Sequence, residues 1–406
     1  MLAVVALGAA VVAASSVLWQ AWHAAPIDLN LHCGFDGWSW CRMAAGRTGD
    51  RPYERRFLVA LLVSLTRPTL GGAWVRFFVV DAVSVAGLLV GVAALTQRVA
   101  LHLGAPGSRA RHAAVIAASA LALGVYPWHF SLQVPVNTDV PSAALGLGWL
   151  LVVTSGDDRR AWWSVPLAFA TQASRDTWAP PLLLACGVLL LLVASRRRLA
   201  VATASAVGVA IGISLLVHAT PGSHTRALPA VFHAQLRAKF GSVHGLVVYL
   251  WLVAFGLGAL SLFALPTLRR ARRDPVLAVP WALAVGSAAV ATVAGGTTDR
   301  YLLPTLVVLL GLGLGWVASW RSLALDVALI PALAVTVGIW RPWETMSGHV
   351  PIILKVYDPF TQPWSINKPL LLQHLAGIAA AAVGAVVAGI VVAVQRRTWL
   401  SATPDA

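Results

Sequence analysis

The apolar residues of the chain fall into continuous blocks of about 20 residues, without the strict alternation that marks a half-buried strand. A helix of that length crosses the ~30 Å hydrocarbon core of a bilayer. The pattern therefore predicts an all-α, polytopic membrane protein with about twelve spans, in a range of roughly 11 to 13. The predicted spans are residues 2–22, 73–96, 113–130, 140–154, 162–173, 177–194, 199–218, 243–266, 276–294, 301–320, 323–340 and 370–394.

Four of the apolar stretches leave an alternative open. Residues 140–154 and 162–173 are short for a crossing helix, so we expect them to be tilted or broken. Residues 57–66 are too short to cross and favour an interfacial or re-entrant helix. Residues 1–22 form either a first span or a signal peptide, although they lack the basic n-region of a signal peptide.

Composition supports the membrane interpretation and excludes other classes. Of the 406 residues, 58% are hydrophobic and 11% are charged, whereas a soluble domain carries about 25% charged residues. The net charge of +15 comes from 30 Lys and Arg against 15 Asp and Glu. Because the longest basic run is only Arg269–Arg273, we expect these charges to orient helices rather than to bind nucleic acid.

The basic residues predict which way the spans face. With a cytoplasmic N-terminus, the short inner loops carry Arg98, Arg109, Arg111, Arg159, Arg160, Arg196–Arg198, Arg269, Arg270, Arg272, Arg273, Arg321, Arg396 and Arg397. Basic residues on the other side lie mostly in long segments, which weigh little in the positive-inside rule. We expect residues 1–406 to form a single domain with both termini cytoplasmic and long outer segments at 23–72, 219–242 and 341–369. Abundant Ala, Val and Arg with little Lys is typical of a GC-rich bacterial genome, which favours the bacterial cytoplasmic membrane.

Polar side chains gather in the first outer segment, residues 28–56. It contains two tryptophans among acids and arginines: Asp28, Asp36, Asp50, Glu54, Arg42, Arg47, Arg51, Arg55, Arg56, Trp38 and Trp40. One interpretation is an amphipathic helix on the lipid headgroups, with Trp at the interface and Arg on lipid phosphate. The other is that the segment contributes to a polar site.

Three further outer clusters favour such a site. They are Asp139 before the fourth span, Arg175-Asp176 between the fifth and sixth spans, and Asp299-Arg300-Tyr301 before the tenth. Each alone can be a local Asp–Arg pair that caps a helix, but together they predict a shared polar cavity. Asp81 lies about eight residues inside the second span, where an ionisable group is costly. It either pairs with Arg76 or another outer Arg, or takes part in a substrate path.

The three cysteines predict one disulfide bond. Cys33 and Cys41 both lie in the first outer segment, where an oxidising environment would let them close a small loop around Asp36, whereas Cys186 lies inside a span. Their spacing does not match a zinc site. The sequence also contains no P-loop, GxSxG, HExxH or dinucleotide fingerprint.

The outer landmarks together resemble a known family. Asp36 is followed by an aromatic residue four positions on, Trp40, and a small residue eight positions on, Ala44, and then by the basic–apolar stretch that begins at Arg55. This order resembles the first outer loop of the GT-C superfamily, which are membrane glycosyltransferases that use polyprenyl-phosphate sugars. The later landmarks look similar and extend the resemblance over about residues 1–320: Thr138-Asp139, Arg175-Asp176-Thr177 and Arg300–Pro304.

The chain departs from the family at one position. Many members follow the loop aspartate with a second acid, and here Gly37 takes that place. The departure puts in doubt any metal bound by an acidic pair, so no cofactor is predicted and a divalent metal has no support in the sequence. It also leaves Asp28 as an alternative base.

The resemblance implies an inverting glycosyltransferase that moves a sugar from a polyprenyl-phosphate donor to an envelope lipid, glycan or protein. We expect Asp36 to act as the general base, and Arg175 and Arg300 to bind the donor phosphate, with Arg55 and Arg56 in reserve. Residues 341–369 either cover the cavity or form an interfacial lid. The further candidate site residues are Asp28, Asp139, Asp176, Asp299 and Trp40. The alternatives are a lipid or sugar-lipid transporter or flippase, and a catalytically silent GT-C-like scaffold.

Overall fold

The computed structural model describes residues 37–47, 56–65, 73–124, 138–217, 228–243, 259–293 and 301–319, together with scattered residues between 245 and 257. These residues form helices and connecting turns, without a β-strand among them. The elements are α2 (Gly37–Ala44), α3 (Phe57–Leu65), α4 (Ala73–His102), α5 (Gly107–Gly124), α7 (Asp139–Val153), α8 (Asp158–Ala161), α9 (Ser164–Ser174), η2 (Asp176–Trp178), α10 (Ala179–Leu192), η3 (Ala194–Arg196), α11 (Arg197–Val217), α12 (Leu228–Phe240), η4 (Ala259–Thr267), α14 (Leu268–Ala271), α15 (Pro275–Val293) and α17 (Leu303–Ala318).

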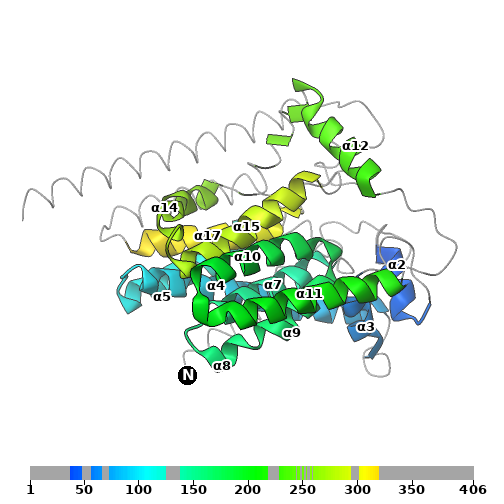
Figure 1. The fold of residues 1–406 in the computed structure, drawn as a ribbon, viewed down its shortest axis with the longest axis horizontal. Helices are drawn as coiled ribbons and strands as arrows, with labels where there is room; N and C mark the ends of the chain where they lie inside the picture. The colour runs from blue at the N-terminus through cyan, green and yellow to red at the C-terminus, as the bar shows by residue number, and fades with distance from the viewer. Residues whose placement is uncertain are drawn as a thin grey trace, which may run out of the picture.

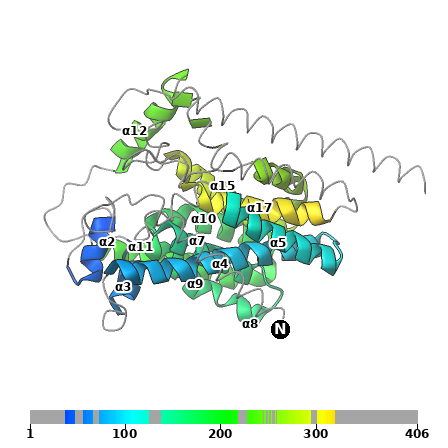
Figure 2. The ribbon, with the colours of Figure 1, turned by 180° about the vertical axis from the view of Figure 1, so that it is seen from behind.

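The long helices lie side by side as a bundle (Figures 1 and 2). α2 and α3 lie at one end of the bundle, and α8 and α14 lie towards the other. α12 stands outside the bundle and crosses the direction of its long helices.

Three helical segments are long and apolar enough to cross a membrane: Arg76–His102, Ala194–Leu216 and Pro275–Val293. Three shorter apolar segments accompany them: Asp139–Val153, Asp176–Leu192 and Leu303–Ala318. The all-α class and the membrane-compatible helices are therefore confirmed. The total of about twelve spans stays a prediction, since 2–22, 323–340 and 370–394 lie outside the described residues.

Most described helices begin and end close to the predicted bounds. α4 runs six residues past the predicted end at 96, and α5 covers Gly107–Gly124 in place of the predicted 113–130, so Arg98, Arg109 and Arg111 lie within helices and not in a loop. A third segment differs in its type of helix. The final part of the predicted span 243–266 is a 3-10 helix, η4, which contains Pro266. Proline has no N–H for an α-helical hydrogen bond, and its ring clashes with the preceding turn. A regular α-helix is therefore disfavoured there, and a short stretch of the tighter 3-10 helix is one alternative. The predicted short helix at 57–66 is α3, and it exposes Leu61, Leu62 and Leu65.

The packing fixes the relative directions of the helices. Gly87 and Gly91 of α4 lie against Ala144 and Leu147 of α7, so both helices run the same way. α17 runs the same way as α4, because Gly311 and Gly315 lie against Leu95 and Val99. α15 runs opposite to α17, and the Thr305 hydroxyl donates to the Ala284 carbonyl oxygen at 3.1 Å. These directions are the ones that alternating spans require.

Two glycines allow the close helix contacts near the candidate site. A Cβ at Gly146 would collide with the ring of Trp178, and one at Gly286 would lie 2.6 Å from Cα of Pro181. Small residues at such positions let membrane helices approach closely. Gly146 thereby seats Trp178 between α7 and α10, and Gly286 brings α15 against α10.

Candidate functional site

Helix ends converge at one end of the bundle. Ser174 ends α9 and Val293 ends α15 there, whereas Asp139 begins α7 and Leu303 begins α17. We call this region the pocket end. The opposite end, which carries Arg98, Arg160, Arg196, α8 and α14, is the basic end.

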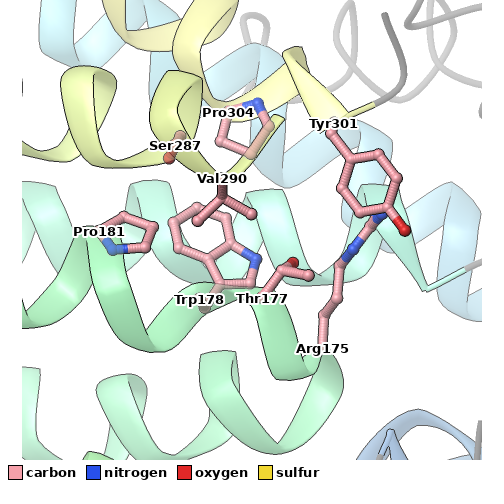
Figure 3. Close-up of a pocket in the computed structure, with 8 residues that line it drawn as sticks. All are labelled: Arg175, Thr177, Trp178, Pro181, Ser287, Val290, Tyr301 and Pro304. Atoms are coloured by element: carbon pink, nitrogen blue, oxygen red, sulfur yellow. The ribbon is translucent and has the colours of Figure 1, made fainter. Parts of the chain in front are cut away.

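A pocket lies between α10, α15 and α17 at the pocket end. It is a small pocket, partly open to the surroundings, whose cavity volume is about 20 Å³. The lining residues are Arg175, Thr177, Trp178, Pro181, Ser287, Val290, Tyr301 and Pro304 (Figure 3). The wall is mostly apolar, with a cation at one side and the Ser287 hydroxyl at another. The hydroxyl oxygen of Ser287 is buried without a hydrogen-bond partner among the described residues.

Arg175 is the cation of this pocket. It directly follows α9 in an extended conformation, φ −156° and ψ 124°, and is 4% exposed. Its Nη1 is ion-paired with Oδ1 of Asp139, the first residue of α7. Its guanidinium carbon lies 4.4 Å from the ring centroid of Tyr301, a cation–π contact in which the two side chains lie together at the edge of the pocket (Figure 3). Asp139 at the start of α7 and Tyr301 just before α17 thus orient one buried cation.

The next residue, Asp176, makes a second, partly buried ion pair. Its Oδ1 accepts from Nε of Arg56 at 3.1 Å, across 120 residues of sequence. The guanidinium of Arg56 lies 5.5 Å from the ring centroid of Trp40. The side-chain amide of Gln172 donates to the backbone carbonyl of Asp176 at 3.2 Å. These contacts connect α2 and the start of α3 to η2, whose residues Thr177 and Trp178 line the pocket.

Asp81 is buried in α4 without a hydrogen-bond partner for either carboxyl oxygen among the described residues. Arg76 does not pair with it; its Nη1 donates to the Val63 carbonyl oxygen at 2.8 Å. Asp81 belongs to the buried stripe of α4 that continues through Leu88, Leu95 and Val99, and α17 packs on that stripe. A carboxyl group so placed in a membrane-compatible helix is a functional candidate in its own right.

The structure brings together five of the predicted site residues: Arg56, Asp139, Arg175, Asp176 and Trp40. Of these, Arg175 lines the pocket. The ion pairs join separate elements rather than sequence neighbours, so Arg175 and Asp176 do not form the local pair that their adjacency suggests.

The other predicted site residues lie outside the described residues: Asp28, Cys33, Asp36, Arg55, Asp299 and Arg300. Cys41 is disulfide-bonded and Cys186 is a free, buried thiol. The pairing of Cys41 with Cys33 stays a prediction. Within the described residues, no group of three or more His, Cys, Asp or Glu side chains could hold a metal ion.

Sequence reasoning missed Trp178 and Ser287 as pocket residues. Trp178 stands three residues after Arg175, and its large apolar side chain next to a polar turn could have indicated a pocket wall. Ser287 stands in an apolar span, where a hydroxyl often bonds to its own helix and gives no signal.

The basic end is built differently. Nη1 of Arg98 donates to the carbonyl oxygen of Leu151 and to Oγ1 of Thr154. Arg196 donates to the carbonyl oxygens of Val153 and Ser155, so both cations satisfy carbonyls at and just beyond the C-terminus of α7. Most of the other arginines there are exposed, namely Arg111, Arg159, Arg160, Arg197, Arg198, Arg269, Arg270, Arg272 and Arg273. Trp162 and Trp163 are also exposed, at 53% and 67%.

No family model, no curated protein and no solved structure matches the chain.

Proposed function

We propose that the chain is a bacterial inner-membrane glycosyltransferase of GT-C type, which moves a sugar from a polyprenyl-phosphate donor to an extracytoplasmic acceptor. The observation that carries the proposal is Arg175, a buried cation oriented by Asp139 and Tyr301 on the wall of an apolar pocket at the end of membrane-compatible helices.

A lipid-phosphate donor has two parts that this arrangement fits. Its phosphate group would lie near the end of the bundle, where a preorganised guanidinium can stabilise the charge of the leaving phosphate. Its isoprenoid chain or the apolar face of its sugar would meet Trp178, Pro181, Val290 and Pro304. A held side chain loses little further freedom on binding, which favours affinity.

The charge balance requires further cations. Asp139 and Asp176 offset Arg175 and Arg56, and a phosphate adds negative charge to the same region. Arg300 directly precedes Tyr301 in sequence, and Arg55 directly precedes Arg56. We propose that these two arginines supply the additional charge, and that Asp36, which directly precedes α2, is the base that takes the proton of the acceptor hydroxyl.

The test is the affinity of purified protein in nanodiscs for a polyprenyl monophosphate. Arg175→Ala should weaken binding by about several-fold to a few hundred-fold, the cost of one charge-assisted contact. Arg175→Lys keeps a cation beside Asp139, so it should fold and restore binding only in part, because the fork geometry is lost.

The matched control is Arg197→Ala, which removes an exposed arginine at the basic end and should leave binding unchanged. Thermal unfolding of each variant separates lost binding from lost fold. Wild-type affinity in both Arg175 variants would place the donor elsewhere and contradict the proposal.

Asp81 favours a second candidate function, movement of a lipid or sugar-lipid across the bilayer. Buried acids in membrane helices mark substrate and proton paths in transporters. In proteoliposomes, a transporter would translocate a fluorescent polyprenyl phosphate, and Asp81→Asn would abolish that movement. A glycosyltransferase would transfer sugar in detergent, where no compartments exist. A silent scaffold, which the Gly37 departure favours, would do neither.

A further inference from the structure

α12 exposes an apolar stripe on its surface. Phe232, Leu236 and Phe240 are spaced four residues apart, so they lie along one side of the helix. Their exposed fractions are 40%, 38% and 46%. α12 therefore presents an apolar stripe that the described residues cover only in part.

The ionisable side chains of α12 are all basic. The helix contains His233, Arg237 and Lys239 and no Asp or Glu. His233 and Arg237 are exposed beside the stripe. A basic edge next to large apolar residues is the pattern of helices that lie in the interface of a phospholipid bilayer, with their cations near lipid phosphates.

Lys239 holds α12 against the C-terminal end of α15. Its Nζ donates to the carbonyl oxygens of Ala291 and Thr292 at 3.2 and 2.7 Å, in the last turn of α15. α15 is one of the helices long and apolar enough to cross a membrane, so its end marks the edge of the hydrocarbon region. Burial lowers the pKa of Lys239 to about 8, and the two carbonyls offset part of the cost of burying this charge.

Tyr249 also helps to hold α12 against the end of α15. The hydroxyl group of Tyr249 lies 2.7 Å from Oγ1 of Thr292, and the ring of Tyr249 lies 5.9 Å from Nζ of Lys239 and 5.1 Å from the ring of Phe240. α12 crosses the direction of the bundle helices, as a helix in the membrane plane must (Figures 1 and 2).

We propose that α12 is an interfacial helix that inserts Phe232, Leu236 and Phe240 into the phospholipid leaflet at the pocket end. The occupant of the stripe is the bilayer itself, at the depth where headgroups meet acyl chains. Ala291, which Lys239 holds, directly follows the pocket residue Val290, so the helix ties the pocket wall to the membrane surface. The inference does not depend on the proposed glycosyl transfer.

The test is the depth of a fluorescent label on α12 in phospholipid nanodiscs. A single cysteine replaces Leu236 and carries an environment-sensitive fluorophore, and Ala234→Cys, an exposed position on a different side of the same helix, is the matched control. Cys41 is disulfide-bonded and Cys186 is buried, so the introduced thiol is the accessible one among the described residues. Lipids brominated in the acyl chains quench labels in the bilayer, and aqueous iodide quenches labels in water.

We expect the label at Leu236→Cys to be quenched by brominated lipid and protected from iodide, and the label at Ala234→Cys to show the reverse. Quenching of both labels by iodide alone would overturn the proposal, because the stripe would then face water. Protection of Leu236→Cys from both quenchers would also overturn it, because protein rather than lipid would cover the stripe. The folded state of each variant is checked by thermal unfolding.

Discussion

The two ends of the bundle use arginine in opposite ways. At the basic end, the Arg160 side chain is 80% exposed and pairs with Asp157, which is 48% exposed. At the pocket end, the Arg175 side chain is 5% exposed and its partner Asp139 is 1% exposed. Arg160 is thus solvated, whereas Arg175 is buried against an acid and an aromatic ring.

The difference separates two roles of positive charge in a membrane protein. Exposed arginines in short loops, with exposed Trp162 and Trp163 beside them, are the pattern of a cytoplasmic boundary. Buried arginines carry a large desolvation cost, which a structure tolerates where each has an anion and further contacts. We therefore propose that the basic end orients the protein in the membrane and that the pocket end is the site of its chemistry.

The side of the membrane on which each end lies should give the largest effect, because the outcome is all or none. If the basic end is cytoplasmic, a cysteine at Thr48 should react with an impermeant reagent in intact cells, and a cysteine at Ser195 should not. Labelling at Ser195 but not at Thr48 would invert the topology and remove the extracytoplasmic site.

The base should give the largest graded effect. Asp36→Asn keeps the size of the side chain and removes its basicity, so sugar transfer should fall by about two to four orders of magnitude. Asp28→Asn should lose less than about tenfold, because Asp28 follows Pro26 close to the first predicted span, where helix capping or solvent exposure is the simpler role. Transfer by purified variants measures both. Wild-type turnover in Asp36→Asn with a dead Asp28→Asn would move the base to Asp28.

Removing one acid should destabilise the protein far more at the pocket end than at the basic end. Asp139→Asn leaves Arg175 buried beside a neutral partner and should destabilise the protein by about 3–5 kcal/mol. Asp157→Asn keeps a helix cap and breaks only an exposed pair, so its effect should stay within about 1 kcal/mol. Unfolding in mixed micelles with rising SDS fraction measures both variants. Equal losses would mean that the pocket-end pair is no more buried than the surface pair.

The ring of Tyr301 should give the smallest effect. Tyr301→Phe keeps the aromatic face under Arg175 and should be close to wild type in stability and donor affinity. Tyr301→Leu removes the cation–π contact and should cost about 0.5–2 kcal/mol. The same micelle unfolding, together with polyprenyl monophosphate binding, compares the two. A loss in Tyr301→Phe as large as in Tyr301→Leu would assign the effect to the hydroxyl group instead.

The helices follow from the sequence because apolar blocks dictate them. The predicted spans 199–218 and 276–294 correspond to α11 and α15 with shifts of one or two residues at each end. Blocks of this kind need no tertiary information, since any helix in a bilayer must be apolar over its crossing length. η4 is the exception, because Pro266 changes the local hydrogen bonding.

The pairing at the site does not follow from the sequence. Arg175 and Asp176 are neighbours, yet their partners are Asp139 and Arg56. The extended conformation at Arg175, between α9 and η2, places the two consecutive side chains against different elements. Adjacency in sequence indicates that both residues lie at the site, but the choice of partner depends on how α3, α7 and η2 pack.

The proposed function requires that the pocket end binds a lipid phosphate. Photo-crosslinking with a polyprenyl monophosphate that carries a diazirine beside its phosphate, followed by peptide mapping, tests it most directly. We predict adducts on Trp178, Val290 or Tyr301, reduced by unlabelled polyprenyl monophosphate and by Arg175→Ala. Adducts that gather at the basic end around Arg160 and Trp163 and leave the pocket residues unmodified would contradict the account.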